Sequence, residues 1–84
     1  MKKLLFFTAK WCGPCKAIKP IVEKEAPEKG CELKYIDVDS DEGLDLTLKK
    51  HIRNLPTLIA LDEQGSEIGR AVGTTAWTEI QQIL

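Results

Sequence analysis

The chain has 84 residues, of which 43% are hydrophobic and 30% are charged, and its net charge at pH 7 is -1. This length supports one hydrophobic core, so we expect a single domain over residues 1–84. The composition excludes a disordered or collagen-like chain. The nearly balanced charge gives no electrostatic footprint for nucleic acid or an anionic membrane surface, so proteins or small molecules are the expected partners.

The start of the chain and its cysteines indicate where in the cell the protein works. The apolar stretch that ends at Phe7 is shorter than the core of a signal peptide, and no stretch approaches the length that crosses a bilayer. The 3 cysteines, two of them in a C-x-x-C motif, differ from the even framework of a disulfide-stapled secreted domain. We therefore expect a cytoplasmic protein without a membrane anchor. We also expect it to be a monomer.

The first two elements are predicted from the spacing of apolar residues. Residues 2 to 9 are mostly apolar, which is typical of a central strand buried on both faces. The next apolar positions fall at helical spacing and predict an amphipathic helix from Cys12 to near Gly30. Pro14 fits its first turn, whereas Pro20 lies inside the helix and is expected to kink it.

A second strand and helix follow. Residues 31 to 38 alternate at first and then become apolar, which predicts a strand at one edge of the sheet. Ser40 can cap a helix that runs through about Ile52, with Leu44, Leu48 and Ile52 on its inner face.

The last third of the chain predicts a hairpin and a helix. Residues 57 to 61 and 68 to 72 flank a short polar segment with a turn-forming glycine. A final helix begins near Thr75. The side chains that we expect it to bury are Trp77, Ile80 and Leu84. The order βαβ-α-ββ-α predicts an α/β fold with a four-stranded mixed sheet and three helices on its two faces.

The C-x-x-C motif stands at the start of the first predicted helix. Cys12 and Cys15 are three residues apart, on one side of the first turn, and close enough to form a disulfide. The free N–H groups and the macrodipole of a helix N-terminus stabilise an anion, so the Cys12 thiolate should form readily. Cys15 lies one turn deeper and should be shielded from solvent. We expect Cys12 to be the nucleophile and Cys15 the resolving thiol.

Three separated segments resemble one known family. Residues 11 to 16, Trp-Cys-Gly-Pro-Cys-Lys, resemble the active-site sequence of the thioredoxin family, and residues 54 to 57, Asn-Leu-Pro-Thr, are similar to its cis-proline loop. The resemblance covers essentially the whole chain and implies a minimal thioredoxin fold. It implies that Pro56 is cis and that the Leu55 backbone pairs with an extended substrate segment. The substrate-binding residues that it implies are Trp11, Gly13, Pro14, Leu55, Pro56, Val72, Gly73 and Thr74.

The resemblance also implies an activity. Such a protein reduces disulfides in other proteins through a mixed disulfide on Cys12, which Cys15 resolves. An upstream thioredoxin-reductase-like enzyme would restore the dithiol, so the protein would carry electrons in cell redox homeostasis. Its redox-active centre is the Cys12–Cys15 disulfide, and the resemblance implies no further cofactor and no metal.

The chain departs from the family at two points. Ordinary thioredoxins have an extra strand and helix before the active-site strand, whereas 10 residues precede Trp11, as in glutaredoxin-sized members. They also usually carry a buried Asp six residues before the first active-site cysteine, where this chain has Phe6. In the family that Asp is thought to accept the proton of the resolving thiol. Without a buried negative charge nearby, we expect a Cys12 pKa no higher than that of ordinary thioredoxins.

Three other interpretations remain open. A glutathione-dependent glutaredoxin fits the size, although the Gly-Pro spacer and the lack of a Gly-Gly pair after Pro56 count against it. A thioredoxin-like binding subunit would use the groove without turnover. A zinc site would need Cys31 and His51 as further ligands, but the predicted strand places Cys31 about 20 Å from Cys12. We expect Cys31 to be a half-buried strand residue and His51 to lie among the last carbonyls of its helix.

Overall fold

Residues 1–84 are all described by the computed structural model, and they form one four-stranded sheet with three helices. The strands are β1 (Lys2–Thr8), β2 (Cys31–Asp37), β3 (Thr57–Leu61) and β4 (Glu67–Val72). The helices are α1 (Gly13–Glu28), α2 (Asp41–Lys49) and α3 (Ala76–Ile80), which continues into a 3-10 turn, Gln81–Ile83. The strand order is β2-β1-β3-β4, with β1 parallel to β2 and antiparallel to β3. The predicted α/β fold is therefore confirmed, with β1 central and β2 at an edge.

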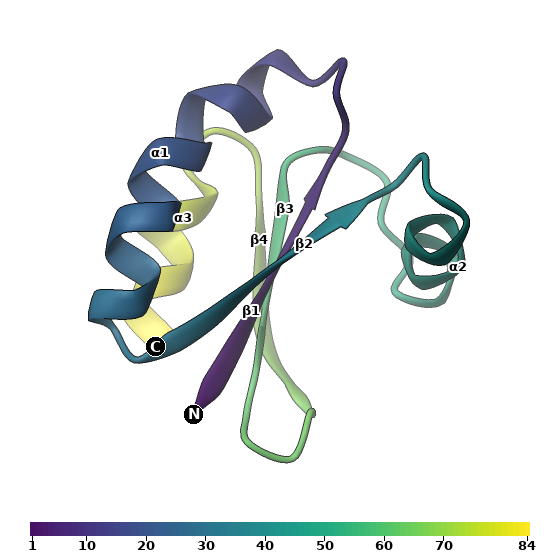
Figure 1. Ribbon diagram of the computed structural model, residues 1–84. Coiled ribbons are helices and arrows are strands. Elements are labelled where there is room, and N and C mark those ends of the chain that lie inside the picture. The colour runs from purple at the N-terminus through teal and green to yellow at the C-terminus, as the bar shows by residue number, and fades with distance from the viewer.

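The sheet separates two layers of helix (Figure 1). Helices α1 and α3 lie side by side on one face, and α2 lies on the other. Because successive side chains of a strand point to opposite faces, β1 contributes to both cores. Leu4 and Phe6 belong to the larger cluster, which α1 and α3 cover, and Leu5 and Phe7 belong to the smaller cluster near α2. No helix is both long enough and apolar enough to cross a bilayer.

Helix α1 begins as the sequence predicts. Cys12 is its N-cap, Pro14 lies in the first turn, and Gly30, with φ 75°, follows the helix end. The residues that the helix buries are Cys15, Ile18, Val22 and Ala26. The assigned helix continues across Pro20 to Glu28, and the kink expected there stays a prediction.

Helix α2 presents a different face to the sheet from the one predicted. Leu44 is 51% exposed and Leu48 is 67% exposed, so their placement on the inner face is wrong. The buried residue is instead Gly43, and Leu46 packs against the smaller core cluster. A Cβ at Gly43 would lie 1.7 Å from the carbonyl oxygen of Asp37. Only glycine allows this close approach, which determines the side of α2 that faces inward.

The end of α2 also differs from the prediction, because the helix stops at Lys49 rather than near Ile52. The amide of His51 donates to the Leu48 carbonyl (3.2 Å), and that of Ile52 donates to the Thr47 carbonyl (3.0 Å). His51 has a left-handed φ of 56°. This pair of bonds is a Schellman C-cap, so His51 does lie among the last carbonyls of the helix.

The C-terminal third matches the predicted hairpin and helix. The Asp62 carboxylate accepts hydrogen bonds from the Gln64 and Ser66 amides, both at 2.9 Å, which holds the turn between β3 and β4. Trp77 and Ile80 are buried as expected, and Leu84 packs at the edge of the larger cluster. The Trp77 indole donates to Glu25 on α1 (2.7 Å), so α3 is bonded to the other helix of its layer.

Candidate active site

The predicted site residues gather at one edge of the sheet. In the strand register Phe7 lies opposite Thr57, and Thr57 lies opposite Val72. The end of β1, the start of β3 and the end of β4 are therefore neighbours. The loops that continue from them lie at the upper end of the molecule, together with the start of α1 (Figure 1).

A disulfide joins Cys12 and Cys15 across the first turn of α1, with their Cα atoms 5.3 Å apart. The amide of Cys15 donates to the Cys12 sulfur at 3.2 Å. A helix N-terminus leaves its first N–H groups without carbonyl partners, and here one of them points at a sulfur. The same donor and the helix dipole favour a thiolate on Cys12 once the disulfide is reduced.

Both cysteines are nearly enclosed by the larger core cluster. Cys15 is 1% exposed, as expected for the deeper residue, and Cys12 is 3% exposed. The two thiols therefore differ only slightly in solvent exposure. Their positions on the helix separate them more, because Cys12 is the N-cap and receives the amide bond, whereas Cys15 lies inside the first turn.

The loop before β3 contains the cis proline that the resemblance implies. The Leu55–Pro56 peptide bond is cis. The Pro56 carbonyl accepts a hydrogen bond from the Gly73 amide (2.9 Å), which fastens this loop to the end of β4. The Thr57 hydroxyl donates to the Asn54 carbonyl at 2.6 Å and closes the loop from inside. No backbone hydrogen bond within the chain uses the amide or carbonyl of Leu55.

The segment after β4 lies beside this loop. Gly73 has φ 93°, a conformation that side chains rarely adopt, although a Cβ there would meet no atom within 4 Å. Backbone conformation, rather than lack of space, is therefore the reason for glycine at this position. Val72 and Thr74 are exposed on either side of it. Gly13 and Pro14 are likewise exposed in the first turn of α1.

Trp11 stands before the first cysteine with 70% of its surface exposed. Its indole nitrogen donates to the Asp39 carboxylate at 2.9 Å, so the exposed ring is held in place. From the sequence alone, Asp39 is one of several acidic residues expected in a solvated loop, with no assigned role. It could have been found because it follows the predicted strand of residues 31 to 38, whose end lies beside the end of the parallel strand β1.

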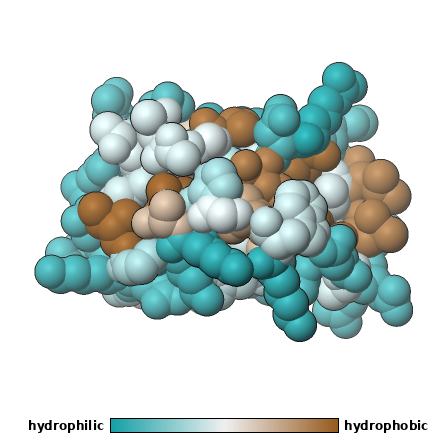
Figure 2. Space-filling model, turned by 90° about the horizontal axis from the view of Figure 1, so that it is seen from above, coloured by the Kyte–Doolittle hydropathy of each residue, from teal (hydrophilic) through white to brown (hydrophobic).

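A small apolar hollow opens next to Trp11. Its volume is about 140 Å³, and its lining residues are Trp11, Val38, Thr47, Ile52, Arg53 and Leu55. Seen from this end, the molecule shows apolar areas bordered by hydrophilic side chains (Figure 2). Sequence reasoning found only Trp11 and Leu55 in this set. The other four, Val38, Thr47, Ile52 and Arg53, lie between β2 and β3 in the chain. Only the fold brings them to the same end of the molecule as the cysteines.

Phe6 fills its position with an apolar ring. It is completely buried, and its ring centroid lies 5.4 Å from that of Tyr35 on β2. The Tyr35 hydroxyl donates to the Glu23 carboxylate on α1, and the Lys19 ammonium lies 5.0 Å from the Tyr35 ring centroid. Burial, and then the hydrogen bond and charge of Glu23, raise the pKa of Tyr35. Phe6 therefore supplies no carboxylate near the thiols.

Cys31 lies far from the two other cysteines. It begins β2 opposite Lys2, at the end of the sheet away from α1's first turn. It is 3% exposed, so it is more deeply buried than expected, and burial raises its thiol pKa while the charge of Lys2 partly opposes that rise. The zinc interpretation needs Cys31 beside Cys12, and the register contradicts it. No group of three or more His, Cys, Asp and Glu side chains is placed to hold a metal ion.

The fold and the site define a class of protein, namely small α/β domains that present a dithiol–disulfide pair at a helix start beside a cis proline. Comparison with known proteins agrees, because residues 1–84 match the sequence model of the Thioredoxin family. The chain belongs to the thioredoxin family.

Individual relatives support this assignment. Thioredoxin of Bacillus subtilis is 35% identical over 78 residues, which are 93% of this chain and 74% of that protein. Thioredoxin-2 of Saccharomyces cerevisiae is 42% identical over 67 residues, covering 80% of this chain and 62% of that protein. Among solved structures, Fasciola hepatica thioredoxin has a TM-score of 0.83 and 31% identity over 98% of this chain and 76% of its own. The chain is a thiol-disulfide oxidoreductase of the protein-disulfide reductase type.

Proposed function

We propose that Cys12 is the attacking thiol and Cys15 the resolving thiol of this reductase. The Cys12 thiolate attacks one sulfur of a substrate disulfide, forms a mixed disulfide and releases the first substrate thiolate, which takes up a proton. The Cys15 thiolate then attacks the Cys12 sulfur and releases the second substrate thiolate. The substrate gains two electrons and two protons, and the protein is left with the Cys12–Cys15 disulfide.

One observation carries this assignment of roles. The amide of Cys15 donates to the sulfur of Cys12 at 3.2 Å at the start of α1, and no corresponding donor reaches the Cys15 sulfur. The thiolate is therefore favoured on Cys12, and the thiolate is the reactive form of cysteine. Cys15 lies inside the first turn of α1, so it would react with a disulfide that has already formed on Cys12, the N-cap residue.

The groove beside the cysteines would bind an extended segment of the substrate protein. The amide and carbonyl of Leu55 are free to pair with such a segment as an added strand. The surfaces that would flank it are those of Trp11, Gly13, Pro14, Pro56, Val72, Gly73 and Thr74. The hollow beside Trp11 offers room for one apolar side chain of the substrate.

The cellular setting is part of the same proposal. A thioredoxin-reductase-like enzyme would return two electrons to the Cys12–Cys15 disulfide, so the chain would act as an electron carrier in cell redox homeostasis. It would work in the cytoplasm as a monomeric single domain. No cofactor beyond the disulfide is needed for the two exchange steps, because each transfers electrons between sulfurs.

A trapping experiment tests the two roles, with insulin as the substrate. The Cys15→Ser variant should accumulate a mixed disulfide between Cys12 and an insulin chain, visible by mass spectrometry and removed by dithiothreitol. The Cys12→Ser/Cys15→Ser double variant is the control and should capture nothing. Capture by Cys12→Ser that equals capture by Cys15→Ser would reverse the roles.

A turnover assay tests the electron donor. Insulin reduction driven by NADPH and a thioredoxin reductase should exceed reduction driven by glutathione, and Cys31→Ser should support the same rate as the native chain. A faster glutathione reaction would identify a glutaredoxin-like reductase instead. Full biological function of the Cys12→Ser/Cys15→Ser variant would identify a binding subunit.

A further inference from the structure

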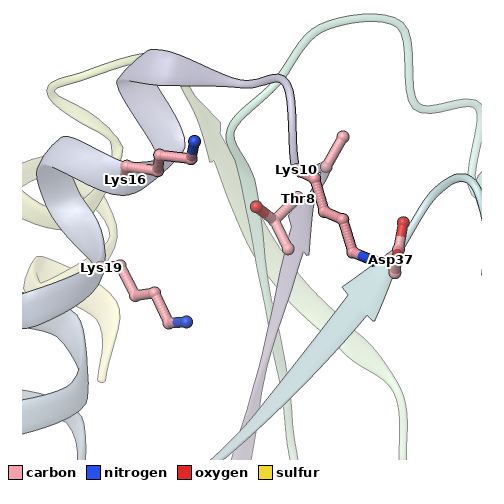
Figure 3. A pocket seen from close by; sticks show the side chains of 6 residues that line it. Thr8, Lys10, Lys16, Lys19 and Asp37 are labelled. Atoms are coloured by element: carbon pink, nitrogen blue, oxygen red, sulfur yellow. The ribbon is translucent and has the colours of Figure 1, made fainter.

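A second cavity lies between the middle of α1 and the ends of β1 and β2 (Figure 3). Its volume is about 300 Å³, and its lining residues are Thr8, Ala9, Lys10, Lys16, Lys19 and Asp37. Only one of the six is hydrophobic. The disulfide exchange described above uses none of these side chains, so the cavity calls for a separate explanation.

The topology brings the polar groups together from three elements. Thr8 and Asp37 are register partners at the carboxyl ends of the parallel strands β1 and β2. Ligands of α/β folds commonly bind at this end of parallel strands. Lys16 and Lys19 are three residues apart on α1, and both extend toward the strands (Figure 3). Lys10 continues from β1 and reaches toward Asp37.

The cavity carries an excess of unpaired positive charge. Three ammonium groups line it against the single carboxylate of Asp37, and that carboxylate already accepts a hydrogen bond from the Asp39 amide (2.9 Å). Lys10 and Lys16 take part in no salt bridge, and Lys19 has only a 3.9 Å contact with Glu23. The Thr8 hydroxyl has no hydrogen-bond partner within the chain. Lys10, Lys16 and the Thr8 hydroxyl therefore face the cavity without a partner, and Lys19 adds a third ammonium group that also lies 5.0 Å from the Tyr35 ring centroid.

We propose that this cavity binds the phosphoryl group of a small phosphorylated molecule. A phosphoryl dianion has three terminal oxygens, which suit three separate ammonium groups, because lysine binds phosphate as a point charge. No arginine lines this cavity, so an anion there would be held by the point charges of the three lysines rather than by a bidentate fork. The volume is at the lower end of small-molecule sites, so it leaves room for one compact polar group beside the phosphate.

The proposed anion site is separate from the substrate groove. The cavity lies on the β2 side of β1, whereas Pro56 and Gly73 lie by β3 and β4 on the other side. Phosphate binding and disulfide reduction can be measured independently, and failure of one does not imply failure of the other.

Nuclear magnetic resonance titration with inorganic phosphate, at constant ionic strength, tests the site. The amide signals of Thr8, Lys10 and Asp37 should shift to saturation. Lys16→Gln/Lys19→Gln should weaken the affinity about fivefold or more, because it removes two of the three ammonium groups. The control is Lys24→Gln/Lys29→Gln, which removes the same charge from two exposed positions, one in α1 and one directly after it, that do not line the cavity. This variant should change the affinity for phosphate less than about twofold.

Three outcomes would overturn the proposal. The first is a shift that stays linear in phosphate concentration, and the second is equal weakening by the two double variants. The third is binding of acetate as tight as that of phosphate, which would show that the cavity does not prefer a phosphoryl dianion. Insulin reduction at saturating insulin should be unchanged in Lys19→Gln, which lies outside the active-site sequence of residues 11 to 16.

Discussion

Phe6 gives the two thiols apolar surroundings at the position where a carboxylate was expected from the family pattern. Its ring is completely buried, with its centroid 5.4 Å from that of Tyr35, so position 6 carries no charged group. A buried negative charge beside a thiol disfavours the thiolate, and a buried apolar ring does not add this repulsion. Position 6 therefore offers no carboxylate for the proton of Cys15, and we expect that proton to leave by water or through Cys12.

The first prediction concerns the titration of Cys12. Followed by ultraviolet thiolate absorbance in the reduced protein, Cys12 should titrate with a midpoint below about 8.5, the ordinary pKa of free cysteine. The thiolate is stabilised by the Cys15 amide, which donates to the Cys12 sulfur at 3.2 Å, and by the helix dipole at the N-terminus of α1. The Cys12→Ser variant should lack this transition. A midpoint at or above that of free cysteine would contradict the prediction.

Cys31 should behave as an inert thiol. It is 3% exposed, and burial raises its thiol pKa, so the reactive thiolate is scarce and shielded at neutral pH. In the oxidised native protein we expect no alkylation by iodoacetamide over a time in which free cysteine reacts completely. Denaturant should expose one reactive thiol, counted by mass spectrometry. Rapid alkylation of Cys31 without denaturant would show that the start of β2 opens readily.

At the scale of elements, an ion pair within β4 is hydrogen-bonded to the end of α2. Arg70 donates two hydrogen bonds to the Glu67 carboxylate (2.7 and 2.8 Å) and a third to the carbonyl of Lys50 (2.9 Å). The hydrogen bond from Arg70 is the main reason that the pKa of Glu67 is lowered. A carboxylate with a lowered folded-state pKa stabilises the fold above its unfolded pKa, and this contribution is lost as pH falls through the folded value.

Glu67→Gln should therefore lower the free energy of unfolding by about 0.5 to 1 kcal/mol near neutral pH, the upper part of the range for partly exposed pairs. As pH falls below about 4.3, the ordinary pKa of glutamate, the difference from the native chain should begin to shrink, and it should vanish only below the lowered folded pKa, where Glu67 is protonated in both folded and unfolded chains. Urea unfolding at several pH values measures this. Glu63→Gln, in the turn of the same hairpin, is the control and should change little. A difference that stays constant with pH would indicate lost packing instead.

Helix α2 shows where prediction from sequence fails and why. Leu44 and Leu48 are four residues apart and form an apolar stripe, which favours an inward orientation on pattern alone. The contact that decides the orientation is the approach of Gly43 to the Asp37 carbonyl, a feature of the loop before α2 that has no periodic signature. The strands were predictable because each has a continuous or alternating apolar pattern and short turns between them.

For the whole molecule, the site was predictable where its signals are local. The motif at residues 11 to 16 and the loop at residues 54 to 57 each carry their chemistry within a few residues. The bond between Trp11 and Asp39 spans 28 residues, and the lysines of the second cavity come from two elements. Neither arrangement follows from spacing, because each depends on how α1 and β2 meet β1 in space.

The two faces of the sheet bury very different numbers of residues, which predicts that the helices on them open locally at different free energies. The face under α1 and α3 has 15 buried residues in its cluster, whereas the face under α2 has 4. Helix α2 buries only Gly43 fully and leaves two leucines exposed. Segments with few buried contacts open at a lower free energy than the core, so α2 should exchange its amide hydrogens by local opening.

Native-state hydrogen exchange in increasing urea measures this opening. Amides of α2 should exchange at least about tenfold faster than those of β1 and β3, with little dependence on urea, because local opening exposes little surface. The buried half of α1 is the internal control and should exchange with β1, since both belong to the larger cluster. Equal protection of α2 and β3, with the same urea dependence, would mean that the smaller cluster unfolds only with the whole domain. Leu46→Ala should accelerate exchange in α2 more than Leu48→Ala, because Leu46 packs against the sheet and Leu48 is 67% exposed.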